Sequence, residues 1–259
     1  MTSQQHHLEI EFLGTGTSTG VPQLGCSCDV CRSADPRDRR LRTSAIVRYC
    51  GKNILIDCGP DFRCQMLRAG NPHIDALLLT HIHYDHVGGI DELRGHDYGP
   101  DFPIFARGDV IRALHERLPY CFGEQTYPGA PQLHIHPVEE GRAFTVCGIP
   151  VDPIAVRHYL LPILGYRIGP LAYITDAKTI ADDQIEALRG TPLLVVNALR
   201  IARHLSHQSL DEALELIERI NPGQAWLVHM SHGIGLHEQV QRMLPPRVHL
   251  AYDTLRVGV

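Results

Sequence analysis

The sequence lacks a run of eighteen apolar residues, a block rich in lysine and arginine, and an apolar stretch behind a positively charged start. The first absence argues against a membrane-spanning helix, because crossing a bilayer takes about 20 apolar residues. The missing signal-like start argues against secretion, so we expect a cytoplasmic protein. With a formal net charge of −5, the missing basic block argues against a long nucleic acid as partner, because such partners usually require a basic surface.

No internal repeat, low-complexity tract or interdomain linker divides the 259 residues. This length suits one large α/β domain or a layered arrangement of two similar halves, and we expect a single domain over 1–259. Hydrophobic residues make up 44% and charged residues 20% of the chain, as in ordinary globular enzymes. Seventeen histidines are many for this length and favour metal chemistry.

Several predicted strands end in polar residues that bind metals in other proteins. The apolar run 76–79 predicts a strand over 74–80 that is buried on both faces. Ser209 and Glu212 form a predicted capping box, which starts a helix that Asn221 ends. Strands are also predicted over 8–13, 43–49, 53–57, 143–156 (a pair), 171–175, 193–196 and 225–228, and a further helix over 110–118. His81, Asp176 and His229 each lie at or just after a strand end, where α/β folds place their chemistry.

His81, His83, Asp85 and His86 lie within six residues, between the strand over 74–80 and the Gly88-Gly89 turn. Side chains two apart on an extended segment can converge on one ion, whereas Asp85 and His86 can serve a second one. A surface histidine cluster is the alternative, but the position between a buried strand and a tight turn argues against it. The pattern therefore predicts a metal site.

This string resembles the H-x-H-x-D-H signature of the metallo-β-lactamase superfamily, and the resemblance extends from the Gly14-Thr15-Gly16 loop to the C-terminus. It implies an α/β fold of four αββα layers, two packed mixed sheets flanked by helices. It also implies two divalent ions, Mn²⁺ or Zn²⁺, one bound by His81, His83 and His158, the other by Asp85, His86 and His229, with Asp176 bridging them. His134 and His136 are rival ligands by residue type, but they lie in what looks like a peripheral segment before Pro137.

A polar loop contains three cysteines, Cys26, Cys28 and Cys31, in a stretch of six residues. Their spacing is typical of a knuckle around tetrahedral zinc, which needs a fourth ligand. Inert buried cysteines or a redox pair are the alternatives. The segment, together with the sequence from 229 to 232, resembles the PhnP-like branch of cyclic phosphodiesterases within the superfamily. That resemblance implies a structural zinc knuckle over 25–32, completed by His232.

The resemblance further implies a phosphodiesterase that cleaves a small phosphate ester, cyclic esters included, with a hydroxide held by the two metal ions. Asp85 and His207 are the predicted catalytic residues. His207 would protonate the leaving oxygen, and His204 competes for that role. Arg94 is the predicted phosphate contact, and Tyr166 and Arg167 are further candidates.

The same fold permits a tRNA 3′-processing endonuclease, a lactonase or a thioesterase. The net charge and the lack of a basic exosite arm argue against tRNA. A non-enzymatic metal-binding or scaffold protein is the alternative from another class, and the intact ligand set argues against it. The expected partner is a small phosphate ester, without a membrane, and the family resemblance suggests a homodimer.

Overall fold

A computed structural model describes residues 7–94, 102–122, 131 and 133–259, and the strands in these ranges form two mixed sheets. The first sheet has the strand order β15 (Arg256–Gly258), β1 (Glu9–Gly14), β2 (Ser44–Tyr49), β3 (Lys52–Ile56), β4 (Ala76–Leu78), β5 (Pro103–Arg107) and β6 (His134–Val138). The second has the order β11 (Thr179–Ile180), β8 (Ile149–His158), β9 (Leu161–Ile168), β10 (Leu171–Tyr173), β12 (Leu193–Asn197), β13 (Gln224–Val228) and β14 (Val248–Leu250), and β7 (Phe144–Val146) pairs with β8.

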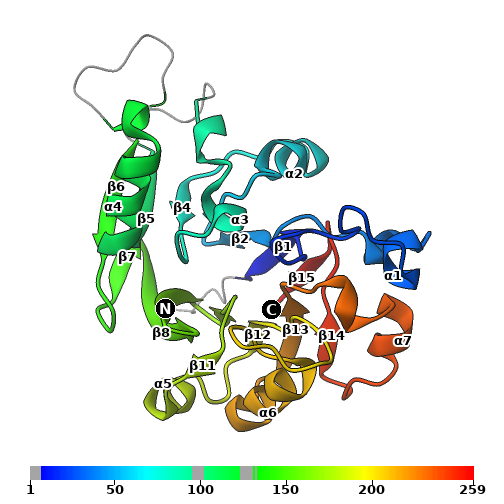
Figure 1. Ribbon diagram of the computed structural model, residues 1–259. Helices are drawn as coiled ribbons and strands as arrows, with labels where there is room; N and C mark the ends of the chain where they lie inside the picture. Colours follow the sequence, from blue (N-terminus) through cyan, green and yellow to red (C-terminus); the bar gives the residue numbers. More distant parts are fainter. Residues whose placement is uncertain (1–6, 95–101, 123–130, 132) are drawn as a thin grey trace.

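Helices cover the outer faces of both sheets (Figure 1). On the first sheet lie α2 (Phe62–Arg68), α3 (Tyr84–Val87) and α4 (Gly108–Arg117); on the second lie α5 (Asp182–Ala187), α6 (Leu210–Ile220) and α7 (His237–Gln241). The short helix α1 (Asp29–Arg32) belongs to the cysteine segment, and the 3₁₀ turns in the described ranges are η1 (Pro36–Asp38), η2 (Ile90–Glu92), η3 (Pro119–Cys121) and η4 (His232–Ile234).

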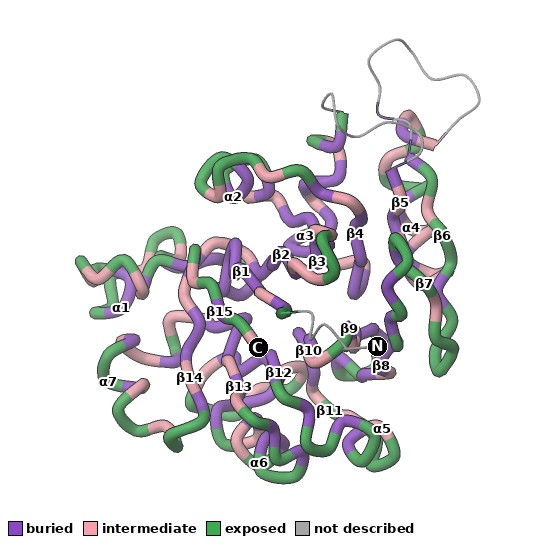
Figure 2. Tube along the Cα trace, turned by 180° about the vertical axis from the view of Figure 1, so that it is seen from behind, coloured by how far each residue is buried: buried purple, intermediate pink, exposed green. Residues whose placement is uncertain are grey.

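The core is layered because successive residues of a strand point to opposite faces. In β2, Val47 packs between the sheets, while Ile46 packs beneath α2 to α4. In β12, Val195 packs between the sheets and Val196 packs against the helices of the second sheet. Both strands are therefore buried on two faces, as Figure 2 shows for the central strands. This arrangement confirms the predicted four-layer αββα fold.

Most predicted elements are present, with shifted ends. The strand expected over 74–80 is the shorter β4, the helix over 110–118 is α4, and the pair over 143–156 is the β7–β8 hairpin. Ser209 Oγ accepts from Glu212 N–H, and Ser209 N–H donates to the Glu212 carboxylate, which confirms the capping box at α6. The elements that no prediction covered are β5, β6, β9, β11, β14, β15, α1, α2, α3, α5 and α7. No helix in the described residues has the length and apolar character that crossing a membrane requires.

Candidate metal centre

Three imidazoles from two strand ends face one another at the edge of the sheets. His81 and His83 follow β4, and His158 is the last residue of β8. The ring centroids of His81 and His83 lie 4.6 Å apart, those of His83 and His158 5.0 Å, and those of His81 and His158 5.8 Å. The three rings therefore adjoin one another, and the ligand atoms of His158, Asp176 and His207 all lie within 4.8 Å of one another.

Asp176 stands between that group and a second one. The ligand atoms of Asp85, His86, Asp176 and His229 all lie within 4.8 Å of one another. The Asp176 carboxylate lies 3.2 Å from His86 Nε2 and 3.1 Å from His229 Nε2, and 4.0 Å from His81 Nε2. All seven side chains singled out from the sequence as catalytic-metal ligands therefore meet in one cluster.

The cluster fits divalent cations, because buried ring nitrogens within it lack hydrogen-bond partners. Among the described residues, His81 Nε2 and His86 Nε2 are buried without a hydrogen bond. Their other ring nitrogens are engaged, since His81 Nδ1 lies 3.0 Å from Thr80 Oγ1 and His86 Nδ1 lies 2.7 Å from Asp57 Oδ2. Such partners orient a ligating histidine and turn its free nitrogen towards the ion. Imidazole and carboxylate donors together suit Zn²⁺ or Mn²⁺.

Asp57, which was not among the candidates from the sequence, contacts a residue of the cluster. Its carboxylate accepts hydrogen bonds from Thr80 N–H at 2.8 Å and from Thr80 Oγ1, and it contacts His86 Nδ1. Asp57, Asp176 and His229 have φ angles of 60°, 56° and 56°, a left-handed conformation that is uncommon outside glycine. Such backbone outliers cluster at functional sites. The signal in the sequence was the same strand-end position that pointed to Asp176.

Burial and charge act against each other on the ionisable groups of the cluster. Burial opposes ionisation of Asp176, but the imidazoles of His229 and His86 outweigh it and hold the pKa of Asp176 well below its usual value. Burial lowers the pKa of His81 well below its ordinary value. For His86, Asp176 and Asp85 together overcome the effect of burial and raise its pKa. The carboxylates are therefore ionised and ready to bind cations.

His207 contacts the cluster from the loop before α6. Its Nε2 lies 3.1 Å from Asp176 Oδ1, and its ring stacks on His229 with the centroids 5.0 Å apart. His204 lies behind it, with Nδ1 3.3 Å from His207 Nδ1, and burial lowers the pKa of His204. Of the two rival candidates for the general acid, His207 is the one that contacts Asp176.

The arginines predicted to hold the phosphate have other contacts. Arg94 pairs with Asp91 at η2, and its substrate role stays a prediction. Arg167 donates to the Ala187 carbonyl on the outer side of the second sheet. Arg117, which the sequence analysis did not single out, donates to the Ile82 carbonyl at 2.8 Å and so lies beside the metal motif.

The remaining candidates from the sequence lie apart from the cluster. Tyr166 is fully buried between the sheets, and its hydroxyl donates to the Leu79 carbonyl at 2.6 Å. It therefore has a structural position rather than a solvent-facing one. His134 and His136 lie on β6, at the end of the first sheet's strand order. In the described ranges, neither belongs to a group of side chains close enough to share an ion.

The three cysteines meet His232, as predicted. His232 Nδ1 lies 3.2 Å from Cys26 Sγ, 3.3 Å from Cys28 Sγ and 3.6 Å from Cys31 Sγ. The Cys31 backbone amide and His232 lower the pKa of Cys28 to about 6, whereas burial raises the pKa of Cys31 to about 11. Three thiolates this close repel one another, so a cation among them would let all three ionise. This donor set fits tetrahedral zinc.

Backbone pairing links the cysteine segment to the metal cluster. Gly16 forms isolated bridges with Arg42 and with Met230, which follows the cluster residue His229. His232 then begins η4, two residues beyond Met230. The cysteine group and the cluster therefore share one wall, built from residues 14–17 and 229–232.

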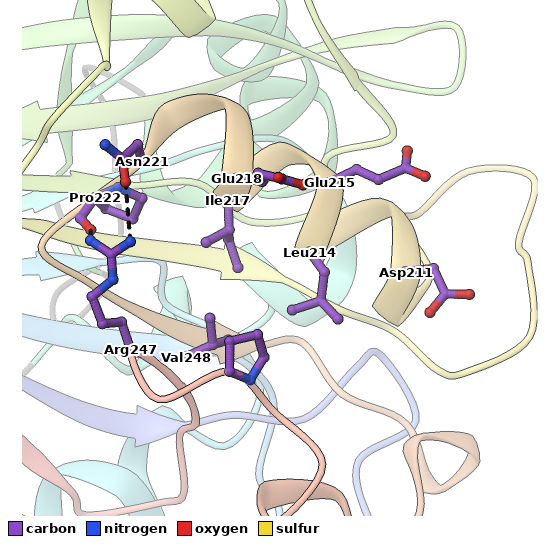
Figure 3. A pocket seen from close by; sticks show the side chains of 10 residues that line it. Asp211, Leu214, Glu215, Ile217, Glu218, Asn221, Pro222, Arg247 and Val248 are labelled. Atoms are coloured by element: carbon purple, nitrogen blue, oxygen red, sulfur yellow. Dashed lines mark hydrogen bonds between the residues drawn. The ribbon is translucent and has the colours of Figure 1, made fainter.

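A separate groove of about 530 Å³ runs along α6 (Figure 3). Leu214, Ile217 and Val248 contribute apolar lining, and Arg247 closes one end by donating to the Asn221 side chain and the Pro222 carbonyl. None of the clustered ligands lines this groove. Its shape therefore does not bear on the chemistry of the metal cluster.

Comparisons with known proteins agree with this geometry. Residues 52–230 match the family model of the β-lactamase superfamily domain. The octanoyltransferase of Porphyromonas gingivalis (strain ATCC BAA-308 / W83) is 46% identical over 94% of this chain, but the chain spans only 50% of that protein. Ribonuclease Z of Mycobacterium sp. (strain KMS) is 25% identical over 97% of this chain and 96% of its own length.

A solved structure extends the match to a narrower branch. The crystal structure of a new diphosphatase from the PhnP family superposes with a TM-score of 0.90 and 38% sequence identity, covering 98% of this chain and 97% of the other. The chain therefore belongs to the metallo-β-lactamase superfamily of metal-dependent hydrolases and, within it, to the PhnP-like branch.

Proposed function

We propose that this protein hydrolyses a phosphorus–oxygen bond of a small phosphate ester with two divalent cations, Zn²⁺ or Mn²⁺. The position of Asp176 carries the proposal, because its Oδ2 lies 3.2 Å from His86 Nε2, while its Oδ1 lies 3.1 Å from His229 Nε2 and 4.0 Å from His81 Nε2. A carboxylate so placed can bind two cations at once. When bound, such a pair acts as a Lewis acid and lowers the pKa of a water molecule to about 7, which makes water a nucleophile at neutral pH.

The proposed roles of the ligands follow their grouping. His81, His83 and His158 would hold one cation, and Asp85, His86 and His229 the other, with Asp176 shared. Asp57 would fix the ring of His86, because its carboxylate lies 2.7 Å from His86 Nδ1, and Thr80 would fix that of His81, because Thr80 Oγ1 lies 3.0 Å from His81 Nδ1. Cys26, Cys28, Cys31 and His232 would hold a structural zinc that stabilises the shared wall.

His207 is the proposed proton donor to the leaving oxygen. Its Nδ1 lies 3.1 Å from Ser206 Oγ. With the Ser206 hydroxyl donating to Nδ1, the ring carries its proton on Nε2, the nitrogen that faces Asp176. That proton is then on the side where the substrate reacts. His204 lies on the Nδ1 side of the ring, so we assign it a supporting role.

The relatives' names support chemistry at phosphorus. The PhnP-family diphosphatase and ribonuclease Z both have names that denote hydrolysis at phosphorus, and this chain matches each of them over nearly its whole length. The octanoyltransferase name denotes acyl transfer, but it belongs to a protein of which this chain covers half. Acyl substrates are therefore included in the test.

The proposal is tested on metal-free protein reloaded with Zn²⁺ or Mn²⁺. Bis-p-nitrophenyl phosphate and the diphosphate UDP-glucose represent phosphorus substrates; octanoyl-coenzyme A and a lactone represent acyl substrates. We expect hydrolysis of at least one phosphorus substrate by the loaded protein, its loss in His83→Ala, and no loss in His136→Ala, an exposed histidine outside the cluster. Cleavage of only the acyl substrates by the loaded protein would refute the proposal.

The role of His207 is tested with two leaving groups. An alkyl phosphodiester needs a proton on the departing oxygen, whereas p-nitrophenolate leaves without one. We expect His207→Asn to lower kcat for the alkyl ester by about 10²- to 10⁴-fold, and to lower it much less for the p-nitrophenyl ester, with metal content retained. His204→Asn is the matched variant. Equal losses with both leaving groups would argue against proton donation by His207.

Location and assembly are part of the same proposal. We propose a cytoplasmic protein, where the thiols of Cys26, Cys28 and Cys31 would stay reduced for metal binding. We also propose a homodimer, which a sedimentation measurement tests by giving twice the mass of the chain.

A further inference from the structure

The metal cluster has a buried side and a side that faces solvent. His81, His86 and His229 are fully buried, whereas His83 and His207 are partly exposed. A substrate therefore approaches past His83 and His207.

Exposed apolar side chains lie close in sequence to the histidines on this side of the cluster. Among the described residues, eight large hydrophobic side chains are exposed, and four of them lie within two residues of His83, His158 or His207. Isolated exposed apolar residues need no explanation, but several of them next to the residues of one functional site indicate binding. We name these four residues the apolar rim: Tyr84, Tyr159, Leu160 and Leu205.

The segments that carry the apolar rim meet at the cluster. The rings of His83 and His158 have centroids 5.0 Å apart, and those of His158 and His207 4.4 Å apart. His158 Nδ1 lies 2.7 Å from the Ser206 carbonyl, to which it donates a hydrogen bond, so the segment after β8 is tied to the segment before α6. Residues far apart in the chain thus bring their apolar neighbours to one opening.

Tyr159 occupies a position where a large side chain is unfavourable. It lies with Leu160 in the two-residue turn of the β8–β9 hairpin, since His158 pairs with Leu161. Its φ is 56°, the left-handed region that such turns normally fill with glycine or asparagine. The side chain is 50% exposed, so burial does not explain the choice. A strained residue beside a reactive centre indicates a functional role.

The ring of Tyr84 lies close to Gly88, and most of the side chain is exposed to solvent. Tyr84 begins α3, directly after His83, and is 67% exposed. A Cβ added at Gly88 would lie 2.8 Å from a carbon of the Tyr84 ring. Gly88 therefore leaves room for the ring to lie against the backbone.

We infer that the apolar rim binds a flat aromatic group of the substrate, of the kind a nucleoside carries, while the phosphate lies at the metal cluster. This inference rests on the proposed function. Stacking of a base on an aromatic side chain strengthens binding about five- to 150-fold and tolerates different bases. Leu160 and Leu205 are 76% and 67% exposed on the same segments and add apolar side chains for such contacts.

Two esters with the same leaving group test the inference. Thymidine 5′-(p-nitrophenyl phosphate) and methyl p-nitrophenyl phosphate differ only in the nucleoside, so the ratio of their kcat/KM values measures its contribution. We expect Tyr159→Gly and Tyr84→Ser each to lower this ratio about tenfold. Tyr159→Gly should do so without lowering Tm, because glycine adopts a positive φ without strain. Met243→Ser is the control; Met243 is exposed in the segment between α7 and β14 and should leave the ratio unchanged.

Two outcomes overturn the inference. Equal losses for both esters in the tyrosine variants would mean a general structural role, and an unchanged ratio would mean that the rim does not contact the nucleoside. If the variants instead halve the mass in solution with the ratio unchanged, the rim is a contact between two copies of the chain.

A measurement of nucleotide binding separates the test of the apolar rim from the test of the proposed function. If the wild type cleaves neither ester, hydrolysis at phosphorus fails, but calorimetric titration with thymidine 5′-monophosphate still reports on the rim. We expect Tyr159→Gly to weaken binding of that nucleotide about tenfold and to leave binding of inorganic phosphate unchanged. Equal affinities of wild type and variant for the nucleotide would reject the nucleoside site whatever the activity.

Discussion

The substitution Asp57→Asn tests how the protein holds its metal ligands. Asp57 is fully buried, accepts from Thr80 N–H at 2.8 Å, and lies 2.7 Å from His86 Nδ1. Asparagine has the same shape and can still accept from Thr80 with its oxygen. Its amide nitrogen would then face His86 Nδ1. That nitrogen donates, so His86 Nδ1 must accept, and the ring proton moves to Nε2.

The size of the effect follows from that proton. His86 Nε2 is the nitrogen that faces Asp85 and Asp176, both at 3.2 Å, and it would bind the cation. A protonated Nε2 cannot bind a cation. To bind metal, the variant must therefore move the His86 proton back to Nδ1, where it faces the amide nitrogen of the introduced asparagine unfavourably. Loss of such a supporting carboxylate typically costs 10- to 100-fold in metal affinity, or about 1.4–2.7 kcal/mol.

The assay is a competition titration of metal-free protein against a chelating dye, with metal content measured by mass spectrometry. We expect one of the two cations to bind 10- to 100-fold more weakly to Asp57→Asn, with an unchanged circular dichroism spectrum. The control is Asp253→Asn, a buried aspartate that accepts from Thr15 and Leu41. If both variants matched the wild type within about twofold, well below the expected loss, the reasoning about the His86 tautomer would be refuted.

Three further predictions follow from the structure. His83→Ala should abolish turnover and keep the fold, since His83 is partly exposed; a melting temperature far below that of the wild type would contradict this. Cys28→Ala should lower Tm and should also lower the zinc content by one ion per chain. An unchanged Tm and zinc content would reject the zinc knuckle. Burial raises the pKa of Asp253 to about 6, so the folded state holds this proton more tightly than the unfolded chain does. The resulting stability is present below about pH 4 and is lost as pH rises through 6, about 3 kcal/mol in all. Between pH 4.5 and 7.5 the wild type should lose about 2 kcal/mol of this stability relative to Asp253→Asn; denaturant titrations measure it, and an equal pH dependence of both proteins would contradict it.

The fold was largely predictable because its central strands are buried on both faces. Continuous apolar runs such as 193–196 have few interpretations other than a central strand. Elements that mix polar and apolar residues were missed. Strand β9 contains Pro162 and Gly165, which weaken a strand signal, yet it is held by β8 and β10 on its two sides. Tertiary pairing of this kind leaves no trace in local propensity.

The metal ligands were predictable for a different reason. His81, His83, Asp85 and His86 form a dense local string, and the later ligands entered through the family's order of residues. Tyr166 and Arg167 were poor candidates, because a position between His158 and Asp176 in the chain does not tell which way a side chain points. In β9 successive side chains alternate faces, so Tyr166 points into the core and Arg167 towards Ala187.

The left-handed strand ends explain what the sequence could not show. Asp57, Asp176 and His229 each leave a strand with a positive φ, which turns the chain sharply as the strand ends. Asp57 follows a strand of the first sheet, whereas Asp176 and His229 follow strands of the second. These strand ends therefore approach one another only after the two sheets have packed. A positive φ at a non-glycine residue costs about 1–2 kcal/mol, and no local pattern predicts it. Packing of the two sheets therefore fixes the geometry of the cluster, and the residue types fix only its chemistry.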